Sequence, residues 1–99
     1  MQVTGWKSSR RGGTLGLRVG KDSAKKFFPR NWHSVQIELD GQLVTVPITK
    51  TFWTSCPELR SHFITEFLER HGLSPWRPGS PPKMQLLRRL GDTFVVSLG

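Results

Sequence analysis

The residues of this 99-residue chain that could do covalent or metal chemistry are three histidines and a single cysteine. His33, His62, His71 and Cys56 do not follow any spacing that is typical of metal ligands. A thiol near a helix N-terminus is a better nucleophile, and the long helix predicted below would bring Cys56 close to His62. No acidic residue is placed to orient that histidine, so the pair does not complete a nucleophilic site. We therefore expect a protein without a catalytic centre, a bound metal or a cofactor.

Positive charge is concentrated in the first third of the chain. The formal net charge of the whole chain is +8. Residues 1–30 contain eight lysines and arginines and one acid, whereas residues 31–72 carry a net charge of −2 and residues 73–99 carry +3. A solvated surface usually mixes the two signs, so this segregation predicts an anionic partner, above all a nucleic acid. The alternative is a basic domain whose charge serves only its solubility.

Two polar loops and one short helix supply the candidate contact residues. Loop 8–14 combines glycines with an arginine pair, whose guanidinium groups can contact phosphates or read guanine. Residues 49–55 offer hydroxyls, a lysine and an aromatic pair, and residues 25–26 add two lysines. The candidate DNA-binding residues are Lys7, Ser8, Ser9, Arg10, Arg11, Lys25, Lys26, Thr49, Lys50, Thr51, Trp53 and Thr54.

Each candidate also has a structural alternative. Lys25 and Lys26 can form a solvated helix face, and the hydroxyl residues can make turns or cap a helix, which is the role expected for Ser55. Phe52 and Trp53 could stack on exposed bases, as in proteins that bind single-stranded nucleic acid. An aromatic pair beside the start of a helix more often packs in the core.

The elements that would position these residues are mainly short strands. Alternation of apolar and polar residues predicts strands at 34–39 and 42–48, and Asp40-Gly41 predicts a tight hairpin turn between them. An apolar stripe at helical spacing predicts a long helix from Pro57 to Gly72, capped by Ser55 or Cys56. The other expected elements are strands at 2–8, 15–19, 84–88 and 93–98, a helical turn from Asp22 or Ser23 through Lys26, and an irregular proline-rich crossing at 73–83.

These elements amount to one domain, residues 1–99, with one modest core. The expected fold class is α+β, mainly β with two helices, and the expected architecture is a small open barrel of six or seven short strands. A single cysteine and an N-terminus without an apolar leader predict an intracellular protein. No apolar run approaches the length of a membrane-spanning helix, so we expect no membrane partner.

Four segments of the chain resemble the plant-type B-three DNA-binding domain. LRVGKDSAKKFFP at residues 17–29 resembles that family's strand, short helix and Phe-Pro segment, and SVQIELDGQLVTV at 34–46 is similar to its next pair of strands. TFWTSC at 51–56 looks like the aromatic loop after that pair, and HFITEFLERHGL at 62–73 resembles the family's second helix. The same pseudobarrel fold occurs in specificity domains of certain restriction endonucleases. The resemblance covers most of residues 15–98, but SPWRPGSPPK at 74–83 departs from the family pattern.

The resemblance implies binding of double-stranded DNA through two arms that grip the major groove, with no catalysis in the domain. The first arm would run from Lys7 to Arg11, and the second from Thr49 to Ser55. Such a domain would serve transcription regulation, or the recognition step of a restriction-modification or mobile-element system. Two other functions stay open. One is binding of RNA or single-stranded DNA by stacking on aromatic side chains, and the other is capture of a protein partner by segment 73–83.

Overall fold

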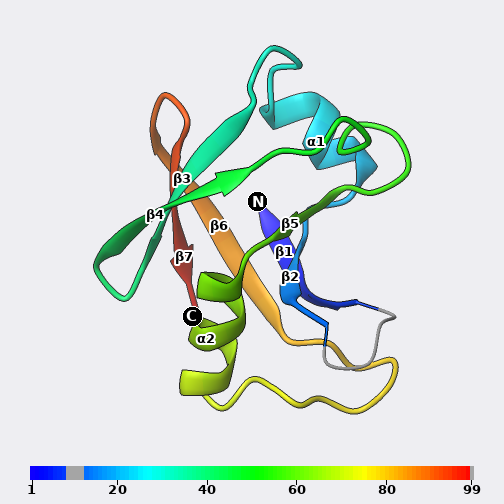
Figure 1. Ribbon diagram of the computed structural model, residues 1–99, viewed down its shortest axis with the longest axis vertical. Helices are drawn as coiled ribbons and strands as arrows, with labels where there is room; N and C mark the ends of the chain where they lie inside the picture. The colour runs from blue at the N-terminus through cyan, green and yellow to red at the C-terminus, as the bar shows by residue number, and fades with distance from the viewer. Residues whose placement is uncertain (9–12, 99) are drawn as a thin grey trace.

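The computed structural model describes residues 1–8 and 13–98, which form one seven-stranded sheet and two helices (Figure 1). In chain order the elements are β1 (Gln2–Lys7), β2 (Leu15–Arg18), α1 (Lys21–Phe27), β3 (Ser34–Leu39), β4 (Gln42–Pro47), β5 (Glu58–Arg60), α2 (His62–Arg70), β6 (Lys83–Leu90) and β7 (Thr93–Ser97). The sheet curls into a small, nearly closed barrel. The predicted fold class, mainly β with two helices, is therefore confirmed.

The strands are hydrogen-bonded in the order β4-β3-β7-β6-β1-β2-β5. Neighbouring strands run antiparallel except β3 and β7, which are parallel. The edge strands β4 and β5 approach each other, and this approach brings the curled sheet close to closure. In the nearly closed ring, β7 lies three strands from β2 in one direction and three from β5 in the other. The outer face of β7 is therefore on the opposite side of the barrel from the β2–β5 edge.

The hairpin of β3 and β4 follows the sequence pattern directly. Val35, Ile37 and Leu39 are buried on one face of β3, and the residues between them are partly exposed. Asp40 and Gly41 form the turn with backbone φ angles of 52° and 81°. Two consecutive positive φ angles are what a two-residue hairpin turn requires, and Asp-Gly tolerates them at low cost. This hairpin prediction is confirmed.

The centre of the core is an aromatic cluster around Phe28, the residue that follows α1. The Phe28 ring stacks on Phe94 of β7 at a centroid distance of 5.2 Å, and it meets Phe52 edge-on at 5.0 Å. Trp32 adds an edge contact at 6.1 Å. Offset and edge-on ring pairs of this kind add stability beyond the area that they bury. The cluster fixes the end of α1 against the sheet.

The predicted long helix is wrong in its first five residues. Residues Glu58–Arg60 form β5, which pairs with β2, and α2 begins only at His62. Ser61 caps this helix, because its Oγ accepts a hydrogen bond from the Phe63 N–H at 3.1 Å. Ser55 and Cys56 are not caps, since their N–H groups donate to the Thr51 carbonyl in a turn. Tertiary pairing with β2 therefore overrides the helical spacing of this segment.

Two smaller expectations are also corrected. The short helix α1 begins after Gly20 without a side-chain cap, so neither Asp22 nor Ser23 is the N-cap. Asp22 instead lies in the first turn, where its charge still suits the helix dipole. Strand β6 continues two residues beyond residue 88, through a shift in register between Arg88 and Leu90. The crossing at 73–82 contains no helix or strand, as predicted.

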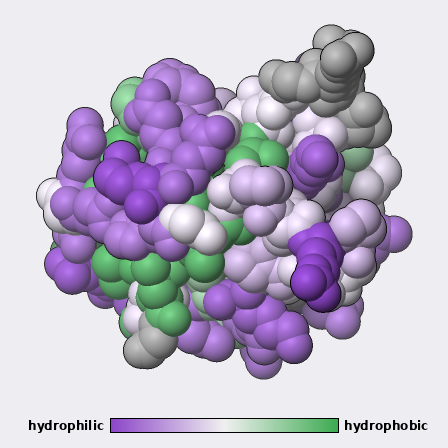
Figure 2. Space-filling model, turned by 90° about the horizontal axis from the view of Figure 1, so that it is seen from below, coloured by the Kyte–Doolittle hydropathy of each residue, from purple (hydrophilic) through white to green (hydrophobic). Residues whose placement is uncertain are grey.

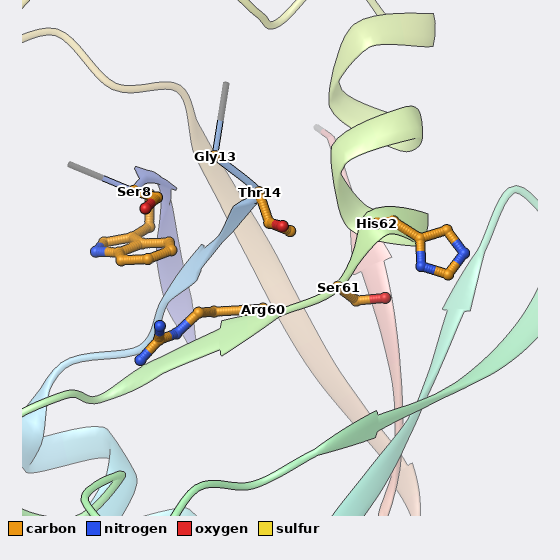
Figure 3. A pocket seen from close by; sticks show the side chains of 7 residues that line it. Ser8, Gly13, Thr14, Arg60, Ser61 and His62 are labelled. Atoms are coloured by element: carbon orange, nitrogen blue, oxygen red, sulfur yellow. The ribbon is translucent and has the colours of Figure 1, made fainter. Parts of the chain in front are cut away.

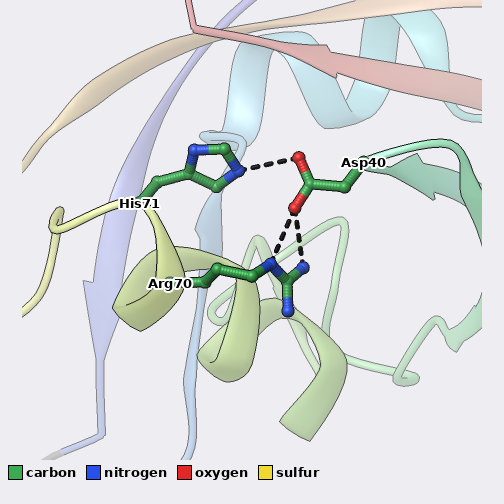
Figure 4. Close-up of polar contacts among 3 residues, drawn as sticks. All are labelled: Asp40, Arg70 and His71. Atoms are coloured by element: carbon green, nitrogen blue, oxygen red, sulfur yellow. Dashed lines mark hydrogen bonds and ion pairs between the residues drawn. The ribbon is translucent and has the colours of Figure 1, made fainter.

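The end of α2 is tied to the β3–β4 turn by one carboxylate (Figure 4). Asp40 accepts hydrogen bonds from Arg70 Nε at 2.8 Å and from Arg70 Nη2 at 2.7 Å, both on Oδ2. His71 Nε2 lies 2.7 Å from Oδ1 of the same carboxylate. The hydrogen bonds from Arg70, and to a smaller extent the one with His71, hold the pKa of Asp40 below its usual value. We call this arrangement the Asp40 clasp.

The Asp40 clasp makes stability depend on pH. Because the pKa of Asp40 is lower in the folded than in the unfolded protein, its contribution is present above the unfolded pKa and disappears as the pH falls through the folded pKa. We expect Asp40→Asn to lower Tm at neutral pH, with a difference that shrinks below about pH 3.9. Thermal melts from neutral to strongly acidic pH measure this. Glu69→Gln, which removes an equal charge from the exposed side of α2, is the control; equal losses would contradict the role of the clasp.

Gly16 allows β2 and β5 to approach closely. A Cβ atom at this position would lie 2.4 Å from the Leu59 carbonyl oxygen, which is backbone and has no room to move aside. A glycine inside a strand often marks such an approach of another backbone. Gly16 is therefore a position of close approach between the backbones of β2 and β5.

Gly16→Ala should separate β2 from β5. We expect a loss of about 1–3 kcal/mol in the free energy of unfolding, the usual cost of overpacking. Gly5→Ala is the matched control on β1, because its Cβ would meet side-chain atoms of Pro82 at 2.9 Å rather than backbone. Urea unfolding of both variants measures the difference. A loss for Gly5→Ala as large as that for Gly16→Ala would contradict the special closeness of β2 and β5.

Candidate nucleic-acid interface

A hollow on the described surface lies where β1 ends, β2 begins and β5 passes into α2 (Figure 3). We call it the first hollow; its volume is about 630 Å³. Trp6 and Ser8 line it from β1, Thr14 from the start of β2, and Arg60, Ser61 and His62 from the β5–α2 junction. Figure 3 shows these side chains arranged around one opening. Segments far apart in sequence therefore meet here.

The first hollow presents one fixed cation and several hydroxyl groups. The Arg60 guanidinium carbon lies 5.0 Å from the centroid of the Trp6 ring, a cation–π contact that orients the side chain. Guanidinium donors match phosphate oxygens in pairs. Thr14 and His62 are exposed beside it, and Ser61 is partly engaged as the cap of α2. The hollow can therefore receive an anionic oxygen group.

A second hollow lies at the other end of β2 and β5, with a volume of about 420 Å³. Lys21 and Lys25 reach it from α1, and Arg30 reaches it from the turn after Phe28. Thr54 and Ser55 bring hydroxyl groups from the loop that precedes β5. Three cations and two hydroxyls around one opening form a site suited to phosphate oxygens. We call it the second hollow.

The two hollows are separated by the length of β2. Thr14 and Lys21 are seven positions apart along the chain, so at about 3.3 Å per residue these two lining residues lie up to about 23 Å apart. Figure 1 shows the ends of β1 and β2 on the same side of the molecule as the loop before β5. The two cationic sites lie at opposite ends of β2 and β5, so they can contact different phosphates of one duplex.

The structure brings some of the predicted contact residues together and leaves others apart. Ser8 lines the first hollow and Lys7 is exposed next to it, while Lys25, Trp53 and Thr54 line the second. The candidates exposed outside both hollows are Lys26, Thr49, Lys50 and Thr51. Ser9, Arg10 and Arg11 lie outside the described residues.

Several residues of the two hollows were missed by the sequence interpretation. Arg60 and His62 were placed on a long helix, because β5 was not predicted. Lys21 was counted in the basic first third but was not assigned to a site, whereas Arg30 was considered beside Lys25 and Lys26 as either a backbone-contact patch or a solvated helix face. The signal that could have found Arg60 is the glycine of β2, since a close approach at Gly16 requires a neighbouring strand.

The aromatic pair after β4 packs in the core, as its structural alternative predicted. Phe52 is fully buried and Trp53 is 7% exposed. The Trp53 indole Nε1 donates a hydrogen bond to the Phe28 carbonyl at 2.7 Å. Neither ring is presented for stacking on a base. Trp53 instead ties the loop before β5 to the end of α1.

The possible pairing of Cys56 with His62 is wrong. Cys56 precedes β5 and His62 follows it, so the thiol and the imidazole lie at opposite ends of that strand. Residues 1–8 and 13–98 contain no group of three or more histidines, cysteines or acids that could hold a metal ion. In the same part of the chain, neither helix has the length and the apolar character needed to cross a membrane.

Comparison with known proteins finds no matching family model, no matching curated protein and no matching solved structure. The barrel and the two hollows are therefore the basis on which a function can be proposed.

Trp53→Phe tests the anchoring role of this residue. The variant keeps an aromatic ring but leaves the buried Phe28 carbonyl without its donor, so we expect a loss of about 1–3 kcal/mol in unfolding free energy. Trp32→Phe is the control, since Trp32 contacts Phe28 and Phe94 through its ring. Chemical denaturation measures both variants. If Trp53→Phe were as stable as the native protein, the hydrogen bond would not anchor the loop.

Proposed function

We propose that this chain is a non-catalytic domain that binds double-stranded DNA across the β2–β5 edge. The observation that carries the proposal is the pair of cationic hollows at the two ends of β2 and β5. Arg60 would contact the phosphates of one backbone. Lys21, Lys25 and Arg30 would contact those of the other backbone. Positive groups facing two phosphate rows supply affinity and position the protein on the duplex.

The positions of the paired acidic groups also favour the β2–β5 edge as the DNA-binding surface. Asp40 is paired with Arg70 and His71, and Glu38 is paired with Arg89. These pairs lie on the β3–β4 hairpin, α2 and β6, away from the two hollows. None of the cations of either hollow takes part in the salt bridges found among the described residues. Charge that is not neutralised by neighbours remains available to an anionic partner.

The resemblance to the B-three domain agrees with this proposal. Its first arm, Lys7 to Arg11, includes Ser8 of the first hollow, and its second arm, Thr49 to Ser55, includes Trp53, Thr54 and Ser55 of the second. The proposed domain would act inside the cell, in transcription regulation or as the recognition part of a restriction-modification system. Phosphate contacts alone carry no sequence information, so sequence preference would come from the polar residues of these two loops.

Arg60→Ala and Lys25→Ala should each weaken duplex binding and reduce its salt dependence. Each lost phosphate contact lowers the slope of log affinity against log salt by about 0.9. We expect the two reductions to add, because the residues lie in different hollows. Fluorescence anisotropy with a labelled duplex over a salt series measures the slope. The charge-matched control is Arg77→Ala, which removes an exposed arginine outside both hollows.

The same titration with a matched single strand separates the alternatives. The proposal requires the duplex to bind more tightly than the single strand, and requires Arg77→Ala to keep the native slope. Stronger binding to the single strand would contradict the duplex proposal. Equal loss of slope in all three variants would show that only net charge is sensed, and would contradict the assignment of the hollows.

A further inference from the structure

An exposed apolar patch covers part of the barrel on the side away from the two hollows. Leu43 of β4, Leu87 of β6 and Leu98 after β7 are 55%, 46% and 44% exposed. Val95 of β7 lies among them, and we call these four residues the leucine patch. Figure 2, which views the molecule from below, shows its largest group of exposed hydrophobic side chains at the lower left, with smaller groups elsewhere on this face. Contiguous apolar surface on a small protein commonly marks an interaction site.

Strand register aligns Leu43, Val95 and Leu87 of the leucine patch in one row. Leu43 pairs with Glu38, Glu38 with Val95, and Val95 with Leu87. One row therefore crosses β4, β3, β7 and β6, and it contains Glu38 as well as three members of the leucine patch. Directly paired side chains on one face of a sheet lie about 5 Å apart. Leu98 joins Leu87 and Val95 around a hollow of about 510 Å³. One end of the row therefore borders a depression in the surface.

The charges within the patch balance each other. Glu38 interrupts the apolar row, and Arg89 Nη2 lies 3.4 Å from its Oε2. Both side chains remain partly exposed, so each can still form an ion pair with a group of another molecule. At the edge of the hollow, Asp40 is likewise matched by Arg70 and His71. This face is therefore nearly neutral, although the whole chain carries a net charge of +8.

We propose that the leucine patch is the interface of a symmetric dimer formed with a second copy of this chain. A two-fold interface brings the same surface of both copies together, so it must be complementary to itself. A patch with apolar residues around one acid and one base meets this condition, because Glu38 of each copy can face Arg89 of the other. A partner of strongly acidic or basic character would leave one of these two groups unmatched. The basic hollows would then point outward from both copies.

The first test is self-association of the full chain. Sedimentation equilibrium over a wide protein concentration range should show a monomer–dimer equilibrium. Leu87→Lys should raise the dissociation constant about tenfold or more, because it places a charge on an apolar residue of the row beside the hollow. Leu90→Lys is the matched control on the same strand: Leu90 is 83% exposed but does not line the hollow. Thermal melts check that both variants fold.

The second test exchanges charges. Glu38→Arg and Arg89→Glu should each lose self-association, since two copies would then oppose like charges. Mixed together, the two variants should form a heterodimer, because each offers the charge that the other now lacks. The proposal would be overturned if the protein were monomeric at all concentrations. It would also be overturned if Leu87→Lys and Leu90→Lys changed the dissociation constant equally. Failure of the mixed variants to associate would overturn the exchange of Glu38 and Arg89. None of these outcomes depends on binding to DNA.

Discussion

The pairing of β2 with β5 is the contact on which the remaining structure depends. It exists because Gly16 has no side chain where the Leu59 carbonyl approaches. It draws residues 58–60 out of the helix that their spacing favours, so α2 starts only after Ser61. The same pairing carries Arg60 to the end of β1, where it meets Trp6. A three-residue strand thus determines both the length of a helix and the position of a cation.

The second hollow depends on a different kind of contact. Residues 48–57 contain no helix or strand, yet they face α1 at a defined distance because the Trp53 indole is bonded to the Phe28 carbonyl. Phe28 is itself fixed by stacking on Phe94 and by its edge contact with Phe52. The lysines of α1 and the hydroxyls of the loop are therefore held in place before any ligand arrives. Such preorganisation lowers the entropy lost on binding.

Local patterns in the sequence were enough for the fold class, the β3–β4 hairpin and the loop positions. Alternating residues and Asp40-Gly41 act through near neighbours, and no distant contact opposes them. The start of α2 could not be predicted from the sequence, because a distant strand competes with a locally favourable helix. The two hollows could not be predicted for a related reason. Lys25 and Thr54, or Thr14 and Arg60, come together only once β2 and β5 are paired.

The place of β7 between β3 and β6 has a consequence for how the chain folds. The β3–β4 and β1–β2 hairpins can form from neighbouring residues, but only β7 joins them into one sheet. Its parallel pairing with β3 links residues more than fifty positions apart, and such distant contacts slow folding. During synthesis, both halves of the sheet would keep an unpaired edge until β7 has left the ribosome.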